Sequence, residues 1–416
     1  MQEGHITKAA YGNKRRPLIH FVAATALTMF VFQTATLAQT TISQKATITL
    51  PNGGQITGFD ISWVDPYSRV YLLADGGNSE VDIVDLNNNN NVYTVGGFNK
   101  TTDPNFTQYC MVCGPNGVVS VNHIEAWAGD GPSFSGPIVL NSNPAVAYAT
   151  SNCDSAVRVI DLVTKQITDT ISTGGCFRAD ENAFDPADQV FLIANPGEMN
   201  IGKSSSVPFI TLISTQPVLP GQHHQILKKI NFDGTNGAPN SIGGSIEQSV
   251  YSPDTGMFYI NASNGPNDVV VVINPQGAAD DIGIVGTYTL NGCGGSTGLA
   301  LKEYIAFIGC GAGAQFMDIR SGNIVATVPQ VSGVDEVTYD AGLNLFAASS
   351  FAGQLYTIDG TSYKLGQTIP SASGAHGITH SQAADSVTGL LYMPVPAFGA
   401  LCGPTPNKGC IAVFGH

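Results

Sequence analysis

The stretch VTYDAGLNLFAASSFAGQLYTIDG, residues 337–360, decides the fold of this chain. It holds a short apolar strand, a turn after Asp340, a second strand that starts at Leu345, and a third strand that ends at Asp359. Runs of Val, Phe, Tyr and Leu between Gly- and Asp-containing turns predict consecutive antiparallel strands. A sheet of this size cannot bury its faces alone, so similar units should occur elsewhere in the chain.

Six other segments repeat this pattern. They are residues 61–86, 145–175, 182–198, 249–263, 299–333 and 378–397. The second strands are predicted to begin at Val70, Val146, Val190, Met257, Tyr304, Leu345 and Leu390. Four of the six intervals are 41 to 47 residues long, which matches one four-stranded blade. The two longer intervals predict insertions near 99–144 and 196–224, and the first could hold an eighth blade.

The two ends of the chain supply an independent prediction. The last unit has strands near 378–384, 389–394 and 410–415, and the chain ends at His416 before a fourth strand. An unassigned strand at residues 46–50 precedes the first unit. We therefore predict an all-β fold, a seven-bladed β-propeller within residues 39–416, closed by the N-terminal strand that completes the last blade.

The segment AVRVIDLVTKQITDTISTGG, residues 156–175, resembles the YVTN-type β-propeller repeat. Relatives with this repeat include lactonase-like propellers and secreted or surface-layer propellers. The resemblance covers most of residues 59–416 and implies the fold rather than one activity, because some relatives are hydrolases or lyases.

The first 38 residues predict an exported protein. Basic residues at positions 8 and 14–16 precede an apolar stretch from Leu18 to Leu37, and small residues lie before Gln39. This is the pattern of a secretory signal peptide. A membrane anchor is the alternative, but the threonines, His20 and Gln33 make the stretch polar for a span. We expect a periplasmic or extracellular protein with no membrane span after the signal is removed.

Net charge excludes some partners. The whole chain carries a formal charge of −14, and removal of residues 1–38 takes away four basic residues and one acid, which leaves −17. Nucleic acid and anionic lipid are therefore not expected partners. A small-molecule substrate or a surface protein partner remains compatible with this charge.

Eight cysteines lie in the predicted mature chain, and an even number in an exported protein favours disulfides. Pairs of Cys153 with Cys176, Cys293 with Cys310, and Cys402 with Cys410 are plausible local links, which leaves Cys110 with Cys113. A redox or zinc role for that CxxC pair is the alternative.

The repeat also aligns ionisable residues. Ten residues before the second strand lie Asp60, Asp180, Glu247, Asp335 and His380. In the two units without this spacing, the first strand should begin near His123 and Thr297. Innermost strands of a propeller start at one end of the central channel, so these seven residues should form a ring there. Four further residues should lie close by, in the loops that lead into these strands: Arg178, Glu181, Glu336 and His376.

Carboxylates and imidazoles that converge in this way need a compensating charge. We expect a divalent metal held by His123, His380, Asp60, Asp180, Glu247 and Asp335, and mixed His and carboxylate ligands suit Fe, Mn or Zn better than Ca²⁺. Catalytic roles are expected for His376, Glu336 and Arg178. Hydrated polar residues that only join neighbouring blades are the structural alternative.

These features predict a metal-dependent hydrolase or lyase, lactonase-like, that acts on a small molecule. The alternative is a non-catalytic binding or scaffold propeller at the cell surface or in the periplasm.

Overall fold

The computed structural model describes most of the unit Gln39–His416. The described residues are 40–51, 54–88, 91–98, 112–133, 155–175, 178–197, 207–219, 221–242, 244–264, 267–277, 281–371, 379, 381–397, 400–404 and 408–416.

The described residues form seven four-stranded antiparallel sheets, each a blade. Blade 1 contains β2 (Ser62–Asp65), β3 (Val70–Asp75), β4 (Glu80–Asp85) and β5 (Val92–Val95). Blade 2 contains β6 (Val112–Val121), β7 (Glu125–Ser133), β8 (Ala156–Asp161) and β9 (Gln166–Ser172). Blade 3 contains β10 (Asn182–Asp185), β11 (Val190–Asn195), β12 (Phe209–Ser214) and β13 (Ile226–Asn231).

The second half of the chain continues in the same order. Blade 4 contains β14 (Ile246–Ser252), β15 (Met257–Asn264), β16 (Asn267–Asn274) and β17 (Gly283–Leu290). Blade 5 contains β18 (Ser296–Lys302), β19 (Ile305–Cys310), β20 (Ala314–Asp318) and β21 (Asn323–Val328). Blade 6 contains β22 (Val334–Asp340), β23 (Leu345–Ser350), β24 (Gln354–Asp359) and β25 (Leu365–Pro370). Blade 7 contains β26 (Ala383–Asp385), β27 (Leu390–Val395), β28 (Cys410–Gly415) and β1 (Ser43–Ile48), and a 3-10 turn (Ala400–Cys402) precedes β28.

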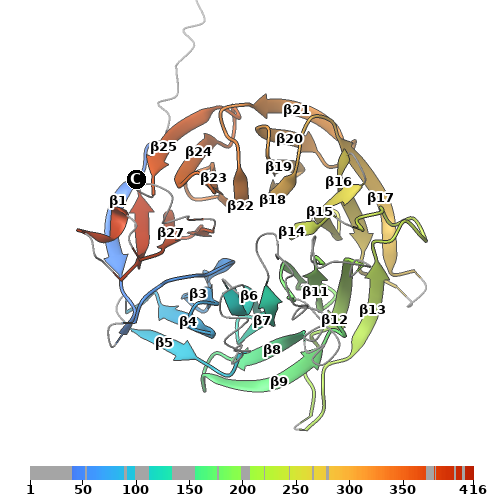
Figure 1. Cartoon of the computed structure of the whole chain (residues 1–416), viewed down its shortest axis with the longest axis horizontal. Helices are drawn as coiled ribbons and strands as arrows, with labels where there is room; N and C mark the ends of the chain where they lie inside the picture. The colour runs from blue at the N-terminus through green and yellow to red at the C-terminus, as the bar shows by residue number, and fades with distance from the viewer. Residues whose placement is uncertain are drawn as a thin grey trace, which may run out of the picture. The chain divides into compact units, whose positions relative to one another are not determined.

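The blades form a closed ring, which confirms the seven-bladed β-propeller (Figure 1). The innermost strand of every blade contacts the innermost strand of the next, including β22 with β26 and β26 with β2. The N-terminal strand closes the ring as predicted, because β1 pairs antiparallel with β28 from Ser43 opposite Gly415 to Ile48 opposite Ile411.

The core lies between the blades. Apolar side chains on facing sheets interdigitate in seven clusters. One of these joins blades 1 and 7, where Tyr71 and Leu73 of β3 pack in the same cluster as Ile411 and Val413 of β28. Each blade is therefore stabilised by its two neighbours rather than by its own hairpins.

A repeated aspartate ends the innermost strand of several blades. The Asp65 Oδ1 accepts hydrogen bonds from the backbone N–H groups of Tyr67 and Ser68. Asp185 and Asp340 accept equivalent bonds from the backbone N–H groups of the second and third residues after them, which lie within the turn. These side chains cap the tight turn to the second strand, so the periodic aspartates of the sequence are explained by turn geometry.

Blade 2 differs from the prediction. Its second strand is β7, which begins at Glu125, so the predicted start at Val146 is wrong, as is the predicted start of its first strand near His123. The sequences VCGPNGVVSV and EAWAGDGPS interrupt the apolar pattern with Gly and Pro, and this hid β6 and β7. In blade 3, β12 lies inside the range 196–224 that was predicted to be an insertion.

Two predicted disulfides are confirmed, Cys293 with Cys310 and Cys402 with Cys410. The other two proposed pairs involve residues outside the described ranges. Across the described residues, no helix has the length and apolar character needed to cross a membrane.

Deletion of residues 39–50 should destabilise the propeller strongly, because it exposes the edge of β28 and removes Ile48 and Leu50 from the core. These two side chains alone contribute roughly 3–6 kcal/mol to the free energy of unfolding. Urea unfolding followed by circular dichroism measures the change, with a chain lacking only residues 1–38 as the control. Equal unfolding midpoints for the two chains would contradict this role for β1.

Candidate functional site at the channel mouth

The acids that occupy equivalent positions in the repeats lie together at one end of the central channel. We call it the mouth cluster, and it consists of Asp60, Arg178, Asp180, Glu181, Glu247, Asp335 and Glu336. They lie at or just before the start of the innermost strands of blades 1, 3, 4 and 6. The charges of Asp60 and Asp335 both act on Asp180, although blades 3 and 6 lie nearly opposite each other in the ring. The predicted convergence of Asp60, Asp180, Glu247 and Asp335 is therefore present.

Irregular backbone directs these side chains toward the axis. The β14–β15 ladder shifts between Ile246 and Ser249, and the β22–β23 ladder shifts between Val334 and Val337. The acids Glu247, Asp335 and Glu336 fall within these shifts. Bulges of this kind turn side chains away from the regular pleat and are common beside functional sites.

Glycine allows the inner strands to approach closely at the same level. A Cβ atom on Gly117 would lie 2.0 Å from the backbone oxygen of Asp180, and one on Gly298 would lie 2.5 Å from that of Asp335. Only glycine fits at such a distance from a neighbouring backbone. The strands that carry the acids are thus held together by close packing, independently of charge.

Arg178 partly compensates the negative charge. Its Nε lies 3.0 Å from Asp180 Oδ2 and its Nη1 lies 3.6 Å from Asp60 Oδ2. A quarter of the Arg178 side chain is exposed, whereas Asp180 is almost fully buried. The guanidinium therefore joins blades 1 and 3 at the edge of the mouth.

Two of the acids have strongly shifted proton affinities. Burial raises the pKa of Asp180 to about 7, against the opposing charge of Arg178, and the carboxylates of Asp60 and Asp335 raise it further. Burial likewise raises the pKa of Glu247 to about 7, although Arg178 lowers it. Glu247 is densely surrounded by protein but keeps partial contact with solvent. Both groups can give and take protons near neutral pH.

A carboxyl pair spans the channel one residue deeper. Glu181 of blade 3 and Glu336 of blade 6 are buried and joined by a side-chain hydrogen bond. Burial, and then the charge of a neighbouring acid, raises the pKa of both. Two ionised carboxylates in contact away from water would repel each other by several kcal/mol, on the order of 4 kcal/mol at an effective dielectric of 20. Burial and like charge therefore favour a state in which this pair keeps a proton.

His123 does not lie at the mouth, contrary to the prediction. It occupies the tight turn between β6 and β7 with a φ of 62°, at the far end of the innermost strand from Asn116. Its Nδ1 lies 2.9 Å from Oδ2 of Asp65, the residue that ends β2. Five residues of extended chain, roughly 16 Å, separate Asp65 from Asp60 along that strand. The error arose because blade 2 begins eleven residues earlier than its sequence pattern suggested.

Two places at the mouth are occupied by uncharged residues: Asn116 stands where His123 was expected, and Thr297 stands where it was predicted. Asn116 takes the place in blade 2, where it is buried and donates to the backbone oxygens of Gly114 and Gly131. Thr297 lies where predicted, and its hydroxyl donates to the backbone oxygen of Val334. Both side chains support the backbone at the mouth rather than adding charge.

The expected metal is not matched by a preformed set of ligands among the described residues. His376 and His380 lie outside the described ranges, and His123 is at the other end of the channel. No three ligand atoms of the described mouth cluster lie within 4.8 Å of one another. Metal binding at the mouth therefore stays a prediction.

Sequence reasoning missed one group that does meet this distance. Asp75, Glu80 and Asp82, in the β3–β4 hairpin of blade 1, bring three carboxyl oxygens within 4.8 Å. The spacing D-x4-E-x-D around a glycine-containing hairpin is the signal that could have found it.

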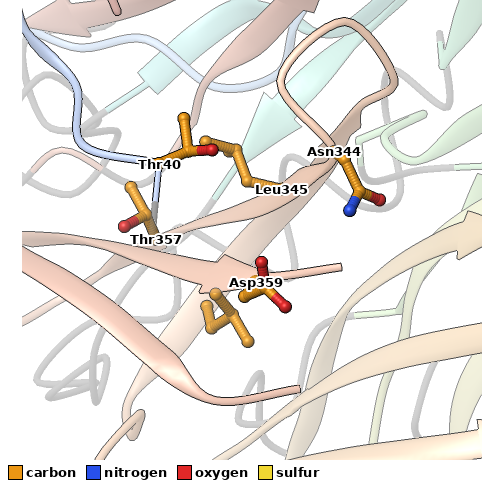
Figure 2. Close-up of a pocket in the computed structure, with 6 residues that line it drawn as sticks. Thr40, Asn344, Leu345, Thr357 and Asp359 are labelled. Atoms are coloured by element: carbon orange, nitrogen blue, oxygen red, sulfur yellow. The ribbon is translucent and has the colours of Figure 1, made fainter. Parts of the chain in front are cut away.

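A small pocket in blade 6 lies away from this chemistry (Figure 2). It is lined by Thr40, Asn344, Leu345, Thr357, Ile358 and Asp359. Leu345 begins β23 and Asp359 ends β24, so the pocket is at the end of the blade opposite Asp335. We assign no function to it.

Comparisons with known proteins support the fold alone. A chain of the solved structure titled "Crystal Structure of Mitotic Checkpoint Complex" superimposes with a TM-score of 0.59 at 13% identity, over 95% of this chain and 99% of that one. No family model matches the chain, and no curated protein matches it. The resemblance to the YVTN and lactonase-like propellers is therefore supported only at the level of the seven-bladed fold.

The mouth cluster should make stability depend on pH. Asp180 and Glu247 keep protons up to about pH 7 in the folded chain, but release them near their ordinary values of 3.8 and 4.5 when unfolded. Between these limits the folded state binds more protons, so the free energy of unfolding should fall as pH rises from about 4.5 to about 7. Urea unfolding in the presence of a chelator measures this slope.

Asp180→Asn should flatten that slope, because the amide does not titrate. Asp318→Asn, which removes an acid paired with Arg320 at an exposed turn, should leave it unchanged. An identical slope in wild type and Asp180→Asn would show that Asp180 titrates normally.

Proposed function

We propose that the channel mouth is the active site of a hydrolase or lyase that acts on a small molecule by general acid–base chemistry. The convergence of acids from blades 1, 3, 4 and 6 around Arg178 is the observation that carries this proposal. Carboxyls with a pKa near the working pH are effective proton donors and acceptors. Structural ion pairs, by contrast, usually hold carboxylates at low pKa values.

The roles follow from burial and charge. Asp180 and Glu247 come from neighbouring blades, so one ionised and one protonated carboxyl can act as base and acid on one substrate. Arg178 is the positive charge beside them and would stabilise an oxygen that becomes negative during the reaction. The buried Glu181–Glu336 pair lies one residue further along the innermost strands and would border a small molecule that enters from the mouth.

The charge of the site also restricts its substrate. Several carboxyls around a single guanidinium repel anions, so a neutral or cationic molecule with a carbonyl or ester-like bond fits best. A divalent cation is the further component expected from the sequence. Asp60 and Asp335 are the partly exposed carboxylates of the mouth cluster that could hold such an ion. No step of the proposed chemistry depends on it.

Export to the periplasm or beyond is part of the proposal. It is supported by the N-terminal sequence pattern and by the two disulfides, which persist in oxidising compartments.

Asp180→Asn and Glu247→Gln should each lower kcat/KM by about 10² or more, because each removes a group that transfers a proton. A panel of small lactones and esters provides the substrate, and the initial rate is measured between about pH 5 and 9. The wild-type rate should change with an apparent pKa near 7, which matches the pKa of about 7 of both acids.

Asp318→Asn is the matched control and should retain the full rate. Folding of each variant is checked by circular dichroism. A wild-type chain that turns over nothing on the panel, with mouth variants that bind partners unchanged, would instead favour a non-catalytic scaffold propeller.

A further inference from the structure

A second group of carboxyls lies in the hairpin that joins β3 to β4. Asp75 ends β3, Glu80 begins β4, and the two are paired across the hairpin. Asp82 lies two residues further along β4, opposite Leu73. One oxygen of each carboxyl lies within 4.8 Å of the others. We call these three residues the hairpin triad, and none of them belongs to the mouth cluster.

Asp82 is a buried carboxyl without a hydrogen-bond donor. It has no exposed surface, and neither of its oxygens accepts a bond from an N–H group or a hydroxyl; its side chain contacts the carboxyl of Asp75 instead. The charges that act on it are those of Asp75 and Glu80, which are also negative. Burying such a group without compensation costs several kcal/mol. A cation between the three carboxyls would supply this compensation.

The rest of the hairpin is already fixed in place. Asp75 accepts from the backbone N–H of Asn78 at 3.0 Å and from its side-chain amide at 2.7 Å. The same amide donates to the backbone oxygen of Gln55 at 2.8 Å. A Cβ on Gly77 would lie 2.4 Å from Thr57 Oγ1, so the hairpin packs tightly on the segment before β2. The triad is thus held by its surroundings before any ion binds.

Two buried side chains of β3, Tyr71 and Leu73, lie near Asp82. Tyr71 is buried in β3, and burial together with the Asp82 and Asp75 charges raises the pKa of its phenol. The charges of both carboxyls act on the phenol, so Tyr71 lies close to the hairpin triad. Leu73, opposite Asp82, packs in the cluster that joins blade 1 to blade 7.

We propose that Asp75, Glu80 and Asp82 bind one divalent cation of the Ca²⁺ type, which ties the β3–β4 hairpin to the interface between blades 1 and 7. All three ligands are carboxylate oxygens, and hard cations such as Ca²⁺ prefer oxygen. Glu80 is only partly buried, so it provides the side from which the ion enters. The site stabilises the fold at the point where the ring closes.

Calcium titration of the chelator-treated chain tests the proposal. Isothermal calorimetry should detect a site in the wild type, and Ca²⁺ at about 10⁻³ M should raise its melting temperature. Asp82→Asn should abolish both effects, and Glu80→Gln, at a partly exposed position, should weaken binding at least about tenfold. Asp85→Asn, on the same strand but outside the triad, should behave as wild type.

Terbium provides a second measurement, because its emission is excited by a nearby aromatic ring. Tyr71→Phe should reduce Tb³⁺ emission while calcium binding is retained. Asp180→Asn should leave both signals intact, which separates this site from the mouth cluster. Loss of binding in Asp180→Asn but not in Asp82→Asn would place the ion at the mouth and overturn the proposal.

A wild-type melting temperature that does not change when Ca²⁺ is added would also overturn the proposed cation site.

Discussion

Pairing of β1 with β28 is the interaction on which the rest of the structure depends. It joins the two ends of the chain in one sheet and lets β26 contact both β22 and β2. Because every blade is stabilised by apolar contact with two neighbours, a gap at blade 7 would expose two sheet faces at once. Closure also sets the diameter of the channel, and therefore how closely the innermost strands approach one another.

The close approach of the innermost strands creates the unusual electrostatics of the mouth cluster. Backbone contacts at Gly117 and Gly298 bring the strands together whether or not their side chains attract. The acids at this level lose water and face like charges, and Arg178 offsets only part of the cost. Apolar packing between blades thus stabilises a cluster that would not assemble alone. Such a local conflict, held in place by the fold, is typical of functional sites.

Much of this arrangement could be predicted from the sequence, because it follows from a repeat. Blade number, the closing strand, two disulfides and the convergence of Asp60, Asp180, Glu247 and Asp335 depend on periodic apolar residues and on the capping aspartates. Blade 2 could not be placed, since its inner strands contain Gly and Pro at positions where the other blades have apolar residues. His123 was misplaced for the same reason.

Other features depend on contacts that no repeat encodes. The Glu181–Glu336 hydrogen bond joins residues 155 positions apart and requires the actual width of the channel. Among the described residues the hairpin triad occurs in one blade only, so a comparison of the repeats does not reveal it. Arg178 was expected at the mouth, but its position between Asp60 and Asp180 became evident only from the structure.

The central claim is that closure of the ring forces carboxyls at the axis to hold protons near neutral pH. Infrared difference spectroscopy of the carboxyl C=O stretch tests it most directly. At pH 7 the wild type should show a protonated-carboxyl band that shifts in D₂O and weakens in Glu181→Gln and in Glu336→Gln. A spectrum in which every carboxyl is ionised at pH 7 would contradict the account.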